Sequence, residues 1–205
     1  NLDFGSKINK FFSENKKIFI QRGDQNAIVL KSVCIGSSAI LLDSVRDYIE
    51  KKYEFNLLLL SSEFEGDASS LANFHASILK EIKRFDRPIK KPAIIVSSGE
   101  AHVKLPKNHG RGGRNSHFAL ALAKEIEGVP GITALAADTD GIDGFEKNAG
   151  AIISGDTFKV LKKSAPQNDF LKAFDSFSAH KIASSLFYSG ATGINLNDIR
   201  IAIVR

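Results

Sequence analysis

The sequence predicts an α/β fold, in which a mainly parallel sheet is flanked by helices in Rossmann-like layers. Short apolar runs, each about as long as a buried strand, alternate along the chain with segments whose apolar residues recur every three or four positions. Such alternation is typical of parallel strands that are connected by helices. The composition, 43% hydrophobic and 25% charged over 205 residues, is that of a globular protein with room for one large domain or two small ones.

Local signals place the elements in order. One helix has an unbroken apolar face, because Leu71, Phe74, Ile78 and Ile82 follow helical spacing. The apolar run 131–137 has the length of a buried strand. We expect strands at 26–35, 55–60, 93–97, 102–105, 131–137, 149–153 and 199–204. We expect helices at 36–53, 65–82, 115–127, 156–163, 167–174 and 179–187.

Residues 110–115, Gly-Arg-Gly-Gly-Arg-Asn, form the most informative segment of the chain. Its glycines allow the backbone to approach a ligand closely, and Asn115 is a favoured N-cap for the helix that follows. A helix N-terminus beside the guanidinium groups of Arg111 and Arg114 suits phosphate or carboxylate. Taken alone, the same residues would also fit a solvated surface turn.

A second motif, Asp138-Thr-Asp-Gly-Ile-Asp-Gly144, follows the strand predicted at 131–137. Its glycines imply tight turns, which would cluster three carboxylates at the sheet edge where ligands bind in open α/β folds. Oxygen ligands there suit Mg²⁺, which takes one or two carboxylates plus substrate phosphates. We do not expect an EF-hand, because the positions that need Gly and Glu hold Asp143 and Ala149. We expect this loop and residues 110–115 to share a cleft, and a pair of capped turns is the alternative.

Charge and hydropathy exclude several classes of function. The net charge of +5 is spread over helix ends and loops without basic–aromatic interleaving, so we expect no nucleic-acid partner. No apolar stretch approaches the ~20 residues that cross a bilayer, and residues 1–17 lack the apolar core of a secretory signal. The single Cys34 cannot form an internal disulfide. We therefore expect a cytoplasmic protein without a membrane partner.

Four motifs occur in order along the second half of the chain: Ser98-Gly99-Glu100, then residues 110–115, 139–144 and 192–198 (Thr-Gly-Ile-Asn-Leu-Asn-Asp). Together they resemble the C-terminal MOFRL domain of the glycerate 2-kinase family, whose members are often labelled hydroxypyruvate reductase. Ala191 stands where proline is usual in the family, and Ser98 where glycine is common. Segments that resemble the part preceding this domain in the family occur at 35–38, 65–68 and 74–76.

The resemblance implies transfer of the γ-phosphate of ATP to the 2-hydroxyl of D-glycerate, with ATP and Mg²⁺ as cofactors and glycerate and the nucleotide as small-molecule partners. Arg111 and Arg114 would bind phosphate or carboxylate oxygens, and Glu100 would orient an arginine or help to activate the hydroxyl. Asp140 and Asp143 would hold the metal directly or through water. The predicted substrate- or nucleotide-binding residues are Gly112, Gly113, Asn115, Thr139, Gly141, Thr192, Gly193, Asn195, Asn197 and Asp198.

The resemblance also divides the chain into a segment at 1–91 and a MOFRL-like domain at 92–205, or makes both one continuous α/β unit. Family enzymes are about twice as long as this chain, so the missing partner would be the N-terminal domain of the same enzyme. We expect the chain alone to be inactive, and a homodimer is compatible with the resemblance.

Two other functions stay open from the residues. The first is a hydroxypyruvate reductase, but residues 110–113 do not form the G-x-G-x-x-G pattern of a dinucleotide enzyme. The second is a ligand-binding module without catalysis. We expect His75 to be a partly buried histidine with its hydrogen bonds satisfied, whereas His102, His109 and His117 lack the spacing of a metal site.

Overall fold

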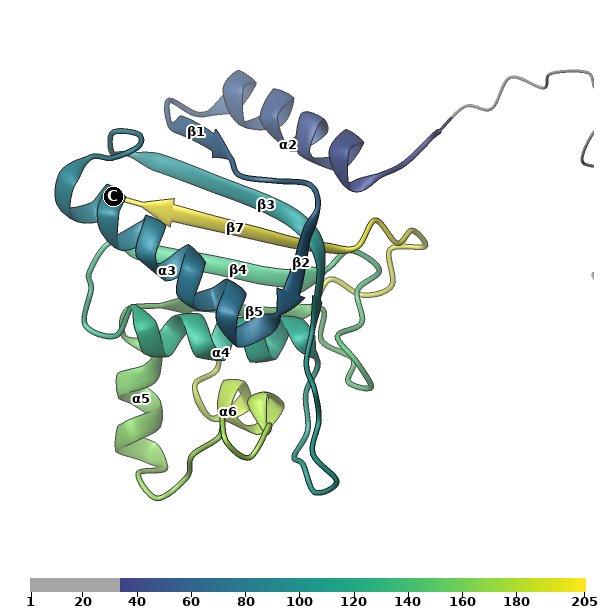
Figure 1. The fold of residues 1–205 in the computed structure, drawn as a ribbon, viewed down its shortest axis with the longest axis vertical. Coiled ribbons are helices and arrows are strands. Elements are labelled where there is room, and N and C mark those ends of the chain that lie inside the picture. The colour runs from purple at the N-terminus through teal and green to yellow at the C-terminus, as the bar shows by residue number, and fades with distance from the viewer. Residues whose placement is uncertain (1–33) are drawn as a thin grey trace, which may run out of the picture. The chain divides into compact units, whose positions relative to one another are not determined.

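Figure 1 shows one sheet with helices packed against it. The computed structural model describes residues 34–205, and residues 36–205 form one compact unit. The strand predicted at 26–35 lies outside the described residues except for its last two positions, which are not in a strand. The helices are α2 (Ser38–Lys52), α3 (Ala68–Phe85), α4 (Arg114–Glu125), α5 (Thr157–Ser164) and α6 (Ser176–Ile182). The strands are β1 (Asn56–Leu59), β2 (Phe64–Asp67), β3 (Ala93–His102), β4 (Ile132–Asp138), β5 (Gly150–Ser154), β6 (Leu186–Phe187) and β7 (Asp198–Val204).

The α/β architecture is confirmed, but the sheet is mixed rather than mainly parallel. Its strand order is β1-β3-β7-β4-β5-β6, with β2 pairing beside β3. β1 and β2 run parallel to β3, whereas β7 is antiparallel to both β3 and β4, and β5 is antiparallel to β4 and β6. The parallel prediction fails because β7, the last strand, inserts antiparallel between β3 and β4, and because β5 is antiparallel to both β4 and β6. No local pattern in the sequence indicates that insertion.

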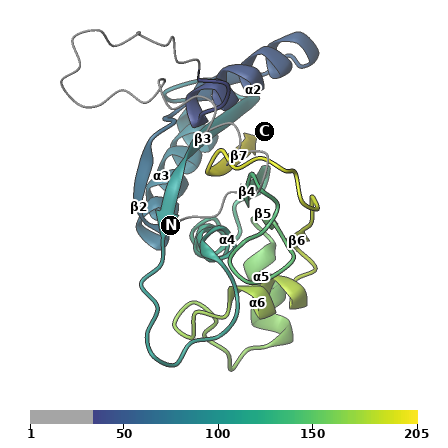
Figure 2. The ribbon, with the colours of Figure 1, turned by 90° about the vertical axis from the view of Figure 1, so that its right-hand side faces the viewer.

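The two faces of the sheet carry different layers. Ile95 of β3 belongs to the core beneath α3 and α4, whereas its neighbours Ile94 and Val96 pack with Leu42 and Ile49 of α2. Because successive side chains of a strand point to opposite faces, α2 must cover the face opposite α3 and α4. Figure 2 shows α5 and α6 below α4, at the end of the molecule away from α2.

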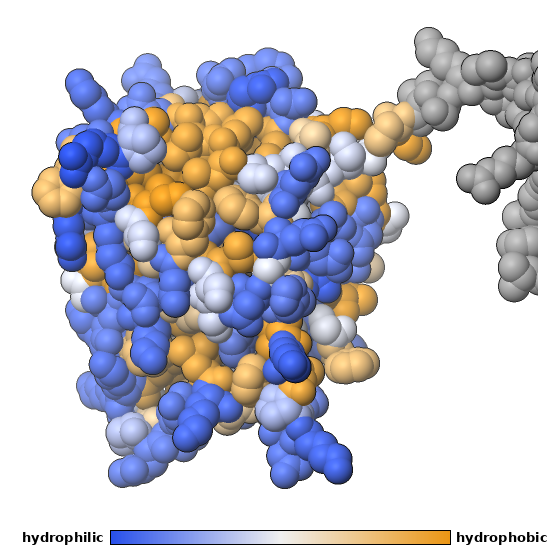
Figure 3. All heavy atoms as spheres, viewed as in Figure 1, coloured by the Kyte–Doolittle hydropathy of each residue, from blue (hydrophilic) through white to orange (hydrophobic). Residues whose placement is uncertain are grey.

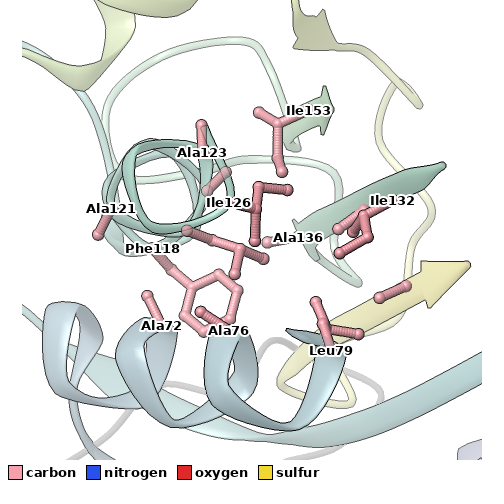
Figure 4. Packing of buried hydrophobic residues seen from close by; sticks show 14 of the residues in the cluster. Ala72, Ala76, Leu79, Phe118, Ala121, Ala123, Ile126, Ile132, Ala136 and Ile153 are labelled. Atoms are coloured by element: carbon pink, nitrogen blue, oxygen red, sulfur yellow. The ribbon is translucent and has the colours of Figure 1, made fainter. Parts of the chain in front are cut away.

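Small side chains let α3 and α4 pack closely. Figure 4 shows the Phe118 ring directed from α4 toward α3, beside Ala72 and Ala76. All three residues are at most 1% exposed. Truncating a buried phenylalanine to alanine typically costs ~3–5 kcal/mol, so this contact fixes α4 firmly. It thereby fixes the loop 110–115, which leads directly into α4.

Two capping contacts explain where helices begin. The Ser37 side chain accepts from the Ile40 N–H at the start of α2, and the Asp67 side chain accepts from the Ser70 N–H at the start of α3. Each contact satisfies one of the N–H groups that have no partner within the helix. These residues are typical N-caps, so sequence predicts both starts to within a few positions.

Four predicted elements differ from the structure. Residues 167–174 form turns rather than a helix. The strands predicted at 93–97 and 102–105 are one strand, because β7 pairs with the first part of β3 and β2 pairs with its last part. The helix predicted at 179–187 is α6, which begins at Ser176 and ends at Ile182, and its last predicted positions form β6.

The face that carries α3 and α4 is not uniformly hydrophilic. Figure 3 shows hydrophobic side chains gathered near the top of the view, in the region where Figure 1 places β1. β1 forms an edge of the sheet among the described strands, and its three leucines are only partly buried. Between residues 34 and 205, no helix has the length and apolar character needed to cross a membrane.

Candidate functional site

Arg114, the first residue of α4, lies among three carboxylates. Its Nε donates to Asp198 Oδ1 at 2.8 Å and its Nη2 to Asp138 Oδ2 at 2.6 Å, while Glu100 Oε1 lies 3.9 Å from Nη2. Although burial lowers the pKa of the Arg114 guanidinium, the nearby carboxylates raise it above its usual value. Asp138 and Asp198 are buried, whereas the Glu100 side chain is 60% exposed. Arg114 is therefore a fixed cation beside an accessible carboxylate.

Asp198 is the centre of this cluster. Its Oδ1 also accepts from the side-chain amide of Asn115 at 2.7 Å. Its Oδ2 accepts from the Ala101 N–H at 2.9 Å and from Arg200 Nη2 at 2.9 Å. One buried carboxylate thus joins the start of α4 to strands β3 and β7. Asn115 and Asp198, both predicted as binding residues, are completely buried, so they support the site from behind.

Asp143 caps α4 from the neighbouring loop. Its two carboxylate oxygens accept from the N–H groups of Asn115 at 2.9 Å and Ser116 at 2.7 Å. The N-cap of α4 is Gly113, so the expectation that Asn115 is the cap is wrong. Burial raises the pKa of Asp143, and the hydrogen bonds from Ser116 and Asn115 oppose that shift. Because the N–H groups of Asn115 and Ser116 already donate to Asp143, they are not available to an anionic ligand. An anion would therefore be bound here by side chains rather than by the N-terminus of α4.

The glycines of the first loop allow this close approach. A Cβ atom at Gly113 would lie 2.3 Å from Asp143 Oδ1, and one at Gly112, where φ is 136°, would lie 2.1 Å from Ser176 Oγ. No side chain fits at either position without displacing a neighbour. Residues 110–115 and 138–144 are therefore in direct contact, at the place where the sequence predicts a shared cleft.

The third predicted loop, residues 192–198, is bonded to the second. Thr139 Oγ1 donates to the Asn197 carbonyl at 2.8 Å, and Thr192 Oγ1 donates to the Thr139 carbonyl at 2.5 Å. The Asn195 side-chain amide donates to Asp140 Oδ2 at 3.1 Å. All four motifs therefore meet at one end of the sheet, since β3, β4 and β7 lead into them.

The two glycines predicted for binding in these loops differ in their surroundings. A Cβ atom at Gly141 would lie 2.0 Å from the Gly190 carbonyl oxygen, so Gly141 is required by close packing between loops. Gly193 has a φ of 76° and open space where a Cβ atom would lie, so its requirement is conformational. Neither glycine belongs to the Arg114 cluster.

Arg111 lies apart from that cluster. Its Nε and Nη2 donate to the two carboxylate oxygens of Glu146 at 2.7 and 2.9 Å, and its guanidinium lies 4.6 Å from the centroid of the Phe177 ring. The hydrogen bonds to Glu146 raise the pKa of Arg111. Its side chain is 64% exposed. No sequence pattern indicated Glu146, which lies just beyond the predicted acidic motif.

Glu100 lines two neighbouring cavities. The first, of about 470 Å³, we call the arginine cavity; it also contains Arg111, Arg114, His117, Phe145 and Phe174. The second, of about 770 Å³, we call the asparagine cavity; it also contains Ser37, Ser38, Glu65, Asn195 and Asn197. Of the predicted site residues, Arg111, Gly112, Gly113 and Arg114 line the first cavity, Asn195 and Asn197 line the second, and Glu100 lines both.

The two predicted metal ligands, Asp140 and Asp143, already accept hydrogen bonds from protein groups. Both oxygens of Asp143 are occupied by helix N–H groups, and Asp140 accepts from the Ile142 N–H at 2.8 Å and from Asn195. Nowhere in residues 34–205 do three or more His, Cys, Asp or Glu side chains gather as a metal site. We therefore assign Asp143 to helix capping.

Two buried histidines support the region from behind. His75 Nδ1 donates to the Leu71 carbonyl at 2.7 Å, and its Nε2 lies 2.8 Å from Ser97 Oγ, so its hydrogen bonds are satisfied as expected. His180 Nε2 donates to the Ser116 carbonyl at 2.9 Å. Burial lowers the pKa of both residues to about 4. His117 stacks on the Phe174 ring at the wall of the arginine cavity.

Comparison with known proteins supports the same motifs. The MOFRL family model matches residues 93–198. The chain is 35% identical over 190 residues to D-glycerate 2-kinase of Thermotoga maritima, covering 92% of this chain and 45% of that protein. It is 36% identical over 151 residues to glycerate 2-kinase of Pyrococcus horikoshii, covering 73% of this chain and 34% of that protein. It is also 38% identical over 149 residues to a putative hydroxypyruvate reductase of Agrobacterium vitis, covering 72% of this chain and 34% of that protein.

A solved structure gives the same result for the fold. The crystal structure of glycerate kinase from Thermotoga maritima superposes with a TM-score of 0.83 at 35% identity. The superposition covers 88% of this chain and 44% of that one. The chain therefore spans about half the length of the curated relatives it matches.

Proposed function

The chain belongs to the MOFRL family, and on that premise we propose that it forms part of a D-glycerate 2-kinase. The reaction would transfer the γ-phosphoryl group of ATP to the 2-hydroxyl of D-glycerate. The relatives named glycerate 2-kinase support the substrate class. The observation in the structure that carries the proposal is the position of Glu100, beside the fixed cation of Arg114 and on the wall of both cavities. Two cavities that meet at one carboxylate suit a transfer between two substrates.

Arg114 would stabilise the negative charge on the phosphoryl group in the transition state of the transfer. Its Nε and Nη2 are held by Asp198 and Asp138, which leaves Nη1 without a hydrogen bond among the described residues. A donor that is already oriented needs no reorganisation as the transition state forms. A planar guanidinium is also suited to phosphate oxygens.

Glu100 would accept the proton of the 2-hydroxyl as that oxygen bonds to phosphorus, while the bond to ADP breaks. Phosphoryl transfer depends mainly on the alignment of the reacting groups and on charge stabilisation, so one carboxylate that accepts the proton is sufficient. The hydroxyl and amide groups of Ser37, Ser38, Asn195 and Asn197 would hold the hydroxy acid in the asparagine cavity. The nucleotide would then occupy the arginine cavity.

Magnesium would arrive as the complex with ATP. Mg²⁺ commonly keeps several waters and binds through substrate phosphates and one or two carboxylates. This mode needs no preformed metal cage, in keeping with the occupied oxygens of Asp140 and Asp143. Asp140, which is only partly buried, would contact the ion through water.

The test is production of 2-phosphoglycerate from D-glycerate, ATP and Mg²⁺. Because the relatives are about twice as long, the assay needs the chain together with the remaining part of such an enzyme, and we expect residues 1–205 alone to show no turnover. Glu100→Gln should lower kcat about a hundredfold, the usual range for a proton acceptor. Glu63→Gln, another exposed carboxylate at the asparagine cavity, is the matched control and should stay within threefold of wild type.

The second candidate is a hydroxypyruvate reductase, which the name of the Agrobacterium relative favours. The same preparation should then oxidise NADH or NADPH in the presence of hydroxypyruvate. Reduction without any glycerate phosphorylation would replace the kinase proposal.

A further inference from the structure

Arg200 is a buried cation behind the Arg114 cluster. It lies on β7 and is 2% exposed, whereas the next residues on the same face of the strand are Ala202 and Val204. Its guanidinium lies 5.1 Å from the centroid of the Phe118 ring. Burying a guanidinium among apolar side chains is costly unless a carboxylate compensates it. Its presence here therefore needs an explanation.

Asp198 provides the compensation. Arg200 Nη2 donates to Asp198 Oδ2 at 2.9 Å. The other two guanidinium nitrogens, Nε and Nη1, have no hydrogen-bond partner within residues 34–205. Burial lowers the pKa of Arg200, and the charge of Asp198 opposes that shift. The neighbouring His75 is neutral near pH 7, because burial lowers its pKa to about 4.

Asp198 is shared between two arginines on opposite sides. Its Oδ1 faces Arg114, which lines the arginine cavity, and its Oδ2 faces Arg200 in the core. With Asp138 ionised, the two arginines and the two buried aspartates form a neutral set. Without Arg200, Arg114 alone would face both aspartates, and the set would carry a net negative charge beside the cavity.

We propose that Arg200 is a positioning residue, which compensates Asp198 from the core side and so leaves the charge of Arg114 available to a phosphate-bearing ligand in the arginine cavity. The identity of that ligand as a nucleotide rests on the proposed function. The charge of Arg114 would act on any ligand that presents a phosphate group. Arg200 touches no cavity ligand in this scheme and acts only through Asp198 and Arg114.

The test measures the Kd of inorganic phosphate by calorimetry. Arg200→Met should raise it at least tenfold, which corresponds to about 1.4 kcal/mol. Arg200→Lys keeps the charge and should stay within threefold of wild type. The double variant Asp198→Asn/Arg200→Met removes one charge of each sign, so it should recover most of the affinity that the single variant loses.

Leu79→Ala is the control for a merely structural effect. Leu79 lies on α3, is 1% exposed and bears no charge, so its truncation should lower the melting temperature without changing the Kd of phosphate. If Arg200→Met does not fold, the double variant and Arg200→Lys are compared with wild type, and a tenfold or greater rise in the Kd of phosphate in either overturns the proposal.

The proposal is overturned if Arg200→Met binds phosphate like wild type, if the double variant binds as weakly as Arg200→Met, or if wild type does not bind phosphate. Failure of the kinase proposal has a different readout. Absence of glycerate phosphorylation, together with the expected order of phosphate affinities, would refute the kinase and retain the role of Arg200.

Discussion

Arg111 and Arg114 are three positions apart in one loop, but their surroundings differ in every respect. Arg111 is exposed, and the carboxylate that its side chain bonds is that of Glu146, whose side chain is 16% exposed. Arg114 is only 26% exposed and lies among three carboxylates, two of which are buried. An ion pair with an exposed partner contributes less to stability and orientation than a buried pair, because solvent screens it. A cation held by buried partners keeps its direction when a ligand arrives.

The difference shows that the two arginines of this loop are not equivalent ligand-binding residues. Arg114 begins α4, whose packing on α3 fixes the backbone, whereas Arg111 lies outside the helix on a segment that contacts Asp175 and Phe177. Helix packing therefore makes one arginine a candidate for transition-state stabilisation, and the other a candidate for initial attraction of an anion. The following predictions test that division.

The largest effect is expected for Arg114→Lys. Lysine keeps the charge but cannot bond Asp198 and Asp138 with two arms of a planar fork, so turnover in the complete enzyme should fall about a hundredfold, or ~3 kcal/mol in the barrier. Arg111→Lys is the matched control in the same loop and should change kcat less than threefold. The measurement is kcat/KM for glycerate and ATP, and equal losses in the two variants would remove the distinction between the arginines.

Acid should lower the free energy of unfolding through two buried histidines. His75 contacts Ser97 of β3 and His180 donates to the Ser116 carbonyl of α4, and the folded-state pKa of each is about 4, below the ~6.5 of an unfolded chain. The stability linked to each histidine is therefore present above pH 6.5 and lost as the pH falls toward 4, by ~2 kcal/mol each at pH 4.5. Burial raises the pKa of Asp138 to about 6, so its protonation offsets part of this loss between about pH 6 and 4.

Urea unfolding at pH 7 and pH 4.5 measures this change in the free energy of unfolding. His75→Gln and His180→Gln should each reduce the difference between the two pH values. A difference that is the same in wild type and in both variants would assign the pH dependence to other groups.

A smaller effect, ~2 kcal/mol of stability, is expected for Asp143→Ala. The substitution leaves the N–H groups of Asn115 and Ser116 without their acceptor at the start of α4, on the Arg114 side of the loop. Asp140→Ala, in the same acidic motif but partly exposed, should cost less than 1 kcal/mol. Urea unfolding of both variants provides the comparison, and similar losses would show that the two aspartates have equivalent roles.

Local sequence signals located most elements but could not assign partners between them. The apolar face of α3 and the caps Ser37 and Asp67 are properties of neighbouring residues, so they can be recognised in the chain. The insertion of β7 between β3 and β4 depends on pairings between distant residues, and that is why the sheet was expected to be mainly parallel.

The same limit applies to the site. The motifs identified the loops that meet, but they did not show that Asp143 would cap α4 or that Glu146 would pair with Arg111. A charged residue among the apolar residues of β7 was the available sign that Arg200 matters, since Ile199, Ile201 and Ile203 alternate with it. Whether that charge faced solvent or the core depended on which face of the sheet α4 covers.

The position of β7 in the sheet has a consequence for synthesis of the protein. Every other described element leaves the ribosome before β7, yet β3 and β4 each need this strand as a partner along one edge. Until it is made, both edges are unpaired and can bond to other chains. The Arg114 cluster is equally late, because Asp198 is the first residue of β7. A nascent chain can therefore have formed every described helix and still lack the Arg114 cluster.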